Sequence, residues 1–96
     1  MSAALLVPAV VLADGQALAK QSGCIACHDV TKKMAGPAFK DVAAKYKADS
    51  GAAAKLEKKV RGGGAGSFGD TPMPAQYPSV SDADIKNIVA WILTLG

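Results

Sequence analysis

The clearest hydrophobic pattern lies at the C-terminal end of the chain, where apolar residues recur every three or four positions. The stripe consists of Ile85, Ile88, Val89, Ile92 and Leu95, and Trp91 widens it. This spacing is typical of a helix that buries one face. Ser81 lies just before the stripe, and Asp84 lies three residues after Ser81, a spacing that resembles a capping box. The pattern therefore predicts a core helix that begins just after Ser81.

Three shorter helices are predicted upstream. Residues 15–22 form a helical stretch that a glycine ends, and residues 39–46 show one apolar face after a Gly-Pro entry. A third helix follows Asp49 or Ser50, either of which can cap it, and it stops at the glycines of positions 62–64. The pattern thus favours an all-α fold of four or five short helices.

Residues 62–80 show neither helical periodicity nor an alternating strand pattern of useful length. An irregular segment of that length is uncommon in a compact domain and is usually functional. With 96 residues and five aromatic side chains, the core is also thin. Such a small domain is usually stabilised by a disulfide, a metal, a cofactor or a partner. Cys24 and Cys27 lie too close together for a disulfide to constrain much of the chain.

The net charge of +3 is unevenly distributed: residues 32–61 carry +6, residues 1–31 carry −1 and residues 62–96 carry −2. Any single lysine here is best interpreted as solvated surface. Because no aromatic-interleaved basic stripe is present, we expect no nucleic-acid binding. The asymmetry favours docking to an acidic protein partner.

Residues 1–13 are apolar, end in Val-Leu-Ala and have the length of a signal-peptide core. They lack the preceding Lys or Arg of such signals, are too short to span a bilayer and contain Pro8. We therefore expect a truncated or retained export signal, a domain at residues 14–96, a periplasmic location and no stable membrane insertion. A retained segment that packs on a partner chain, as in a larger assembly, is the alternative.

Cys24, Cys27 and His28 form the sequence C-x-x-C-H, the attachment signature for c-type haem. Two thiols one helical turn apart can form thioethers with the two vinyl groups of a porphyrin, and the adjacent imidazole can bind iron. A thioredoxin-like redox pair would need a βαβ context, which the sequence pattern does not show. A zinc site needs four ligands, whereas the chain has two cysteines and one histidine. The motif therefore predicts one covalently attached haem c, with chance occurrence in a structural helix as the remaining alternative.

The iron's other axial ligand is expected to be a methionine, because the chain has no second histidine, and the candidates are Met1, Met34 and Met73. Met34 lies six residues after His28 and is better suited to packing against the haem than to ligation. Met73 lies 45 residues after His28 and has a proline on each side, which restricts the backbone. We therefore predict His28/Met73 ligation, a combination that raises the reduction potential.

Four motifs together resemble a small bacterial class I cytochrome c of the c-551/c-552 type, from about Asp14 to Leu95. They are GCIACH, GPAFKDVAAKYK, PMP and VSDADIKNIVAWILTL, in the order and spacing of that family. The resemblance implies a class I cytochrome c fold and an electron-transfer protein that is not an enzyme. It also implies a role between respiratory partners such as a nitrite reductase or a terminal oxidase. A monomer is expected, and a domain-swapped dimer is left open.

The resemblance also assigns roles to single residues. Cys24 and Cys27 become the thioether cysteines, and His28 and Met73 the axial ligands. The carbonyl of Pro37 is expected to accept the His28 Nδ1–H. Cations near a haem propionate are expected at Lys59 and Arg61. Further haem contacts are expected from Leu18, Met34, Phe39, Leu56, Val60, Phe68, Pro72 and Ile88.

Phe68 stands where relatives commonly have a tryptophan that donates its indole N–H to a propionate. Phenylalanine keeps the packing but removes the donor. We expect Ser67 or a backbone N–H to substitute for it. A haem enzyme or gas sensor, in which Met73 is absent from the iron or displaceable, is the rival functional class.

Overall fold

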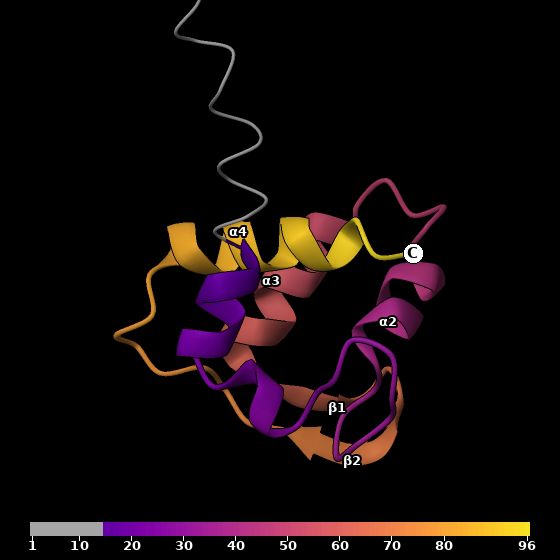
Figure 1. Cartoon of the computed structure of the whole chain (residues 1–96), viewed down its shortest axis with the longest axis horizontal. Coiled ribbons are helices and arrows are strands. Elements are labelled where there is room, and N and C mark those ends of the chain that lie inside the picture. The colour runs from indigo at the N-terminus through magenta and orange to yellow at the C-terminus, as the bar shows by residue number, and fades with distance from the viewer. Residues whose placement is uncertain (1–14) are drawn as a thin grey trace, which may run out of the picture.

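The computed structural model describes residues 15–96. The predictions for residues 1–13 and for a domain start at Asp14 lie outside these described residues. The described chain begins with a helical stretch at residues 15–21, and the elements that follow it are shown in Figure 1. They are η2 (Cys24–Ala26), α2 (Phe39–Lys45), α3 (Ala52–Gly62), β1 (Gly64–Gly66), β2 (Gly69–Met73) and α4 (Asp82–Leu93).

Helix α4 begins as its sequence predicts. Ser81 is its N-cap, and the Ser81 hydroxyl accepts the Asp84 N–H at 3.1 Å. Its buried face consists of Ile85, Ile88, Val89, Trp91 and Ile92. This face packs on α3 and α2. Figure 1 shows α4 on one side of the fold and the β1–β2 hairpin on the other.

The start of α3 differs from the prediction. Its N-cap is Gly51, and neither Asp49 nor Ser50 caps it. The Asp49 carboxylate instead accepts the Gly51 N–H at 2.8 Å and binds the Lys55 ammonium at 2.6 Å. Asp49 therefore orders the turn that leads into α3, in the manner of an Asx turn. The predicted stop is confirmed, since α3 ends at Gly62.

The irregular segment contains a short antiparallel hairpin that the sequence pattern did not reveal. Strands β1 and β2 pair Gly64 with Met73 and Gly66 with Gly69. These strands have three and five residues, are rich in glycine and are exposed along almost their whole length. Because neither face is buried, no alternation of apolar and polar residues marks them. The fold is nevertheless helical in its core.

The core has two parts, which Leu56 joins because it packs against both. One part surrounds Phe39 and Trp91, and the other surrounds Val60 and Val89. The first residues described cross α4 closely: a Cβ atom on Gly15 would lie 2.5 Å from the Asn87 carbonyl oxygen and from the Trp91 Cβ. Within residues 15–96, no helix has the length and apolarity needed to cross a bilayer.

Candidate functional site

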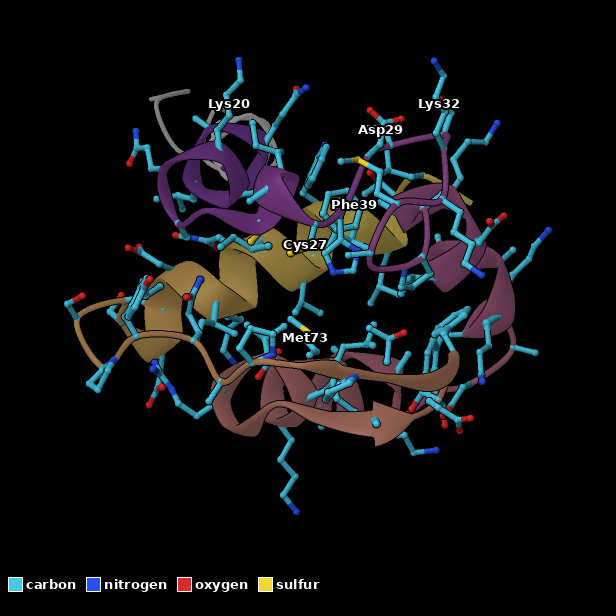
Figure 2. All side chains as sticks on the ribbon, turned by 90° about the horizontal axis from the view of Figure 1, so that it is seen from below. Lys20, Cys27, Asp29, Lys32, Phe39 and Met73 are labelled. Atoms are coloured by element: carbon cyan, nitrogen blue, oxygen red, sulfur yellow. The ribbon has the colours of Figure 1, made fainter. Side chains whose placement is uncertain are left out.

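A cavity of about 470 Å³ lies between the CxxCH segment, helices α2 to α4 and the hairpin. Its volume falls in the range of ligand and cofactor sites. Cys24, Cys27, His28 and Met73 all line it. Figure 2 shows Met73 reaching from the hairpin side towards the space below Cys27 and Phe39. The four residues singled out by their chemistry are thus brought to one place.

The two cysteines are held one helical turn apart by η2. The Cys27 and His28 N–H groups both donate to the Cys24 carbonyl, at 3.3 and 3.0 Å. The two cysteines are half-buried and form no disulfide with each other. Burial raises the pKa of the Cys24 thiol, which keeps it protonated at neutral pH. Cys24 and Cys27 both line the cavity, so each can form a bond to a group within it.

The His28 imidazole is fixed from three directions. Its Nδ1 lies 2.7 Å from the Pro37 carbonyl oxygen. Phe39 stacks on the ring with a centroid distance of 4.9 Å and an interplanar angle of 17°. Gly36 lies so close that a Cβ atom there would be 2.4 Å from the His28 Cε1. Since a carbonyl oxygen can only accept, Nδ1 carries the proton and the Nε2 lone pair is left for a metal.

Hydrogen bonds of the following segment set the position of Phe39 against this ring. The Phe39 and Lys40 N–H groups, at the start of α2, donate to the Asp29 and Val30 carbonyls at 2.9 and 3.0 Å. The Asp29 carboxylate accepts the N–H groups of the two residues at 31 and 32, and these bonds lower its pKa. The helix start, with no side-chain cap of its own, is thereby tied to the residues next to His28.

Met73 ends β2 and is half-buried against Val60, Ile85 and Val89. Its backbone is held close to the end of α3. A Cβ atom on Gly63 would lie 2.5 Å from the Met73 carbonyl oxygen, and Gly63 has a φ of +71°. Glycine is the residue that adopts this conformation without strain and leaves room for that contact.

Most of the other predicted contact residues also line the cavity. They are Pro37, Phe39, Leu56, Lys59, Val60, Phe68, Pro72 and Ile88. Phe39 and Ile88 are almost fully buried, whereas Pro72 is exposed. Phe39, Leu56, Val60 and Ile88 come from three different helices, so this part of the cavity wall is a continuation of the core.

Three residues that were predicted to lie near the haem do not line this cavity. Met34 is 47% exposed and does not line the cavity. The short turn in which its N–H bonds to the Gly36 carbonyl carries it to the surface. Leu18 packs on the core around Phe39 and Trp91 instead. Arg61 also lies away from the cavity, because its guanidinium binds backbone carbonyls and Asp82 beyond the hairpin.

Next to the cavity lining at Ser67 and Phe68 lies a contact that sequence reasoning missed. The Lys45 ammonium lies 4.6 Å from the centre of the Phe68 ring and donates to the Ser67 carbonyl at 2.5 Å. This cation–π contact joins the end of α2 to the hairpin turn. Nothing in the sequence distinguishes Lys45 from the neighbouring lysines. Gly36 was also missed as a site residue, although its place before Pro37 was a usable signal.

The donor set fits a covalently attached haem. Two neighbouring thiols, an imidazole with a free Nε2 and a thioether converge on one largely apolar cavity, as in haem proteins of the His/Met type. A bare metal ion has no comparable site among residues 15–96, which contain no group of three or more His, Cys, Asp or Glu side chains suited to one.

Comparisons with known proteins agree with this chemistry. The family model for cytochrome c matches residues 12–96. The chain is 50% identical to cytochrome c-552 of Nitrosomonas europaea over 98% of its own length and 89% of that protein. It is 45% identical to cytochrome c-552 of Hydrogenobacter thermophilus, over 95% of both chains.

Solved structures give the same result. The crystal structure of Nitrosomonas europaea cytochrome c552 superimposes with a TM-score of 0.79 at 51% identity, covering 84% of this chain and 99% of that one. The class 1 cytochrome MtoD of Sideroxydans lithotrophicus ES-1 gives a TM-score of 0.72 at 36% identity, covering 85% and 92%. The predicted class I cytochrome c fold and the haem c cofactor are thereby confirmed. This chain belongs to the cytochrome c family of electron carriers.

Proposed function

We propose that the protein is a soluble periplasmic one-electron carrier in which His28 and Met73 bind the haem iron from opposite sides. The observation that carries the proposal is the convergence of these two side chains on one cavity from positions 45 residues apart. Cys24 and Cys27 line the same cavity and would hold the haem covalently. A bound haem supplies an iron that alternates between the ferric and ferrous states.

The residues around the cavity favour electron transfer over catalysis. The bond from His28 Nδ1 to Pro37 orients the imidazole and raises its basicity towards a metal. The Met73 thioether is a soft, weak ligand that favours ferrous iron. If His28 and Met73 both bind the iron, no coordination site would be left open for a substrate. We therefore propose a carrier and not an enzyme.

The proposed docking partner is an acidic redox protein. Residues 32–61 carry a charge of +6, and their exposed lysines are Lys32, Lys33, Lys40, Lys45, Lys47, Lys55 and Lys58. Lys32 points outward from the fold in Figure 2. Such a surface attracts an acidic partner weakly and in a salt-dependent manner. The family resemblance favours respiratory partners such as a nitrite reductase or a terminal oxidase.

The periplasmic location is proposed from two features of the sequence. A haem attached through thioethers cannot dissociate, which suits a carrier outside the cytoplasm, and residues 1–13 resemble an export signal. We propose a monomer as the working form. A domain-swapped dimer, in which Met73 would enter the cavity of a second chain, is distinguished by measuring the mass of the haem-loaded protein in solution.

Absorption spectroscopy of the haem-loaded protein tests the ligand assignment. The ferric wild type should show the near-infrared sulfur-to-iron charge-transfer band, and Met73→Ala should abolish it. Met34→Ala is the matched control and should keep the band, because Met34 is exposed and lies outside the cavity lining. A wild type that lacks the band and binds carbon monoxide readily would instead support the haem enzyme or gas sensor.

A further inference from the structure

The loop at residues 74–81 joins Met73 to helix α4, and we refer to it as the 74–81 loop. Figure 1 shows it running along the outside of the fold, from the end of β2 to the start of α4. Most of its residues are exposed, including Tyr77 at 70%. A segment that buries so little apolar surface depends on polar contacts to stay in place.

One arginine supplies several of these contacts. Arg61 lies in the last turn of α3, and its Nη1 donates to the Tyr77 carbonyl at 3.1 Å. Its Nη2 donates to the Val80 carbonyl at 2.5 Å and to the Asp82 carboxylate at 2.9 Å. Its Nε donates to the same Asp82 oxygen at 3.2 Å. The planar, forked guanidinium thus binds the middle and the end of the loop and the first residue of α4.

Gln76, near the beginning of the loop, makes two further contacts, one to the same end of α3 and one to Ser22. The Gln76 N–H donates to the Val60 carbonyl at 3.0 Å. The Gln76 side-chain amide donates to the Ser22 carbonyl at 2.9 Å, across 54 residues of sequence. Gly63 lies against the backbone from Met73 to Ala75. Residues 60, 61 and 63 therefore form one anchor for the chain that follows Met73.

We propose that Arg61 is a positioning residue for Met73: by holding the 74–81 loop on α3 it controls how readily the thioether leaves the iron. The proposal rests on Met73 being an axial ligand. Arg61 does not line the cavity, so its effect on the iron must pass through the loop. A sulfur–iron bond is weak, and the backbone on the C-terminal side of Met73 is restrained by these contacts. Their loss should therefore let an external ligand compete.

The first test is the affinity of the ferric, haem-loaded protein for imidazole. Arg61→Met keeps much of the side-chain length but removes every donor, and it should raise the affinity about tenfold, the effect of one strong anchoring contact. Lys58→Met is the matched control, because Lys58 is an exposed cation of the same helix without a side-chain bond among residues 15–96. It should stay within about twofold of wild type. Arg61→Lys, with its single ammonium, should give an intermediate affinity.

The second test measures opening of the 74–81 loop directly and does not depend on ligation of the iron. Amide hydrogen exchange at Gln76, whose N–H is bonded to the Val60 carbonyl, should become about tenfold faster in Arg61→Met if exchange follows loop opening. Exchange at Ile88, buried in the middle of α4, should change by less than about twofold. Faster exchange at both positions would indicate general destabilisation and would contradict a local role.

Asp82→Ala provides a second variant should Arg61→Met fail to fold. It removes the ion pair but leaves the two carbonyl contacts of Arg61, so imidazole affinity should rise about threefold, consistent with an exposed charge pair. Asp84→Ala, also in the first turn of α4, controls for the lost helix-terminal charge and should show no such rise.

The outcomes separate the two proposals. If the wild type shows the Met73-dependent band but Arg61→Met binds imidazole like Lys58→Met, the positioning role is wrong and the ligand assignment stands. If the band is absent and Met73→Ala leaves imidazole affinity unchanged, the ligand assignment itself is wrong, and the role towards Met73 falls with it. Gln76 exchange then still shows whether Arg61 holds the loop.

Discussion

The two sides of the cavity are built in different ways. On one side, His28 is fixed by residues within eleven positions of it: Gly36 and Phe39 against the ring faces and Pro37 at Nδ1. On the other side, Met73 is placed by a hairpin and by a loop that is anchored to the end of α3 and, through Gln76, to Ser22, 54 residues away in sequence. Packing of buried rings dominates the first side, whereas the second combines a half-buried Met73 with a loop that is held by hydrogen bonds.

Because of this difference, we expect His28 and Met73 to respond differently to destabilisation. Close packing of buried rings is lost only with large disruption of the core, because interiors are densely filled. Hydrogen bonds at an exposed loop each contribute little and can open locally. The segment around His28 should therefore unfold only together with the whole fold, whereas the segment around Met73 should open locally at lower free energy.

The largest expected effect separates the two phenylalanines of the cavity. Phe39 is 3% exposed and contacts His28 and Trp91, so Phe39→Ala should lower the free energy of unfolding by about 3–5 kcal/mol. Phe68 is 39% exposed, and Phe68→Ala should cost about 1 kcal/mol. Urea denaturation of both variants measures the difference. Equal losses would show that the hairpin side is packed as firmly as the His28 side.

The next effect concerns the closest approach to the histidine. In Gly36→Ala the new methyl group would meet the imidazole, with contacts of 2.4 to 2.8 Å, and overpacking of this kind costs about 1–3 kcal/mol. Gly62→Ala is the control, since a Cβ atom at Gly62 meets nothing within 4 Å. It should be neutral or stabilising by about 0.5–1 kcal/mol, because alanine favours the helix. Thermal unfolding of the two variants measures this difference in stability. A Gly36→Ala variant as stable as wild type would mean that the His28 imidazole can move away from the new methyl group.

A smaller effect is expected from the long-range anchor of the other side. Gln76→Ala removes the bond to the Ser22 carbonyl, and the loss should be about 0.5–1.5 kcal/mol. Gln21→Ala, at an exposed helical position, should change stability by less than about 0.5 kcal/mol. If denaturation gives the two variants the same stability, the contact between residues 22 and 76 contributes nothing.

The smallest effect is a pH dependence at the start of α3, the helix that anchors the 74–81 loop. Hydrogen bonds from the Lys55 ammonium and the Gly51 N–H lower the pKa of Asp49 below its ordinary 3.8. Its stabilising contribution is therefore full above that ordinary value and is lost as the pH falls through the lowered pKa. Asp49→Asn should make the unfolding free energy less dependent on pH below about 5. An unchanged acid profile would argue against this contact.

Several features of the fold were predictable because they depend on neighbouring residues. The α4 stripe and its Ser81 cap follow from helical spacing and one hydroxyl, and the end of α3 follows from a run of glycines. The hairpin escaped prediction because both faces of its strands are exposed and its residues carry no strand pattern. Asp49 was predicted as a cap, but it forms the preceding turn, a choice that depends on Lys55 as well.

The candidate site shows the same distinction between what neighbouring residues determine and what the tertiary structure determines. The chain itself determined the donor set: two thiols and an imidazole within five residues, and a methionine between prolines far downstream. Tertiary structure decided which side chains face the cavity. It turned Met34 outward and Met73 inward, and it drew Arg61 away to the 74–81 loop while Lys59 stayed in the lining. The reason is physical: spacing fixes which groups are neighbours along the chain, but the direction of a side chain also depends on the backbone groups that the fold places beside it, such as the Tyr77 and Val80 carbonyls for Arg61.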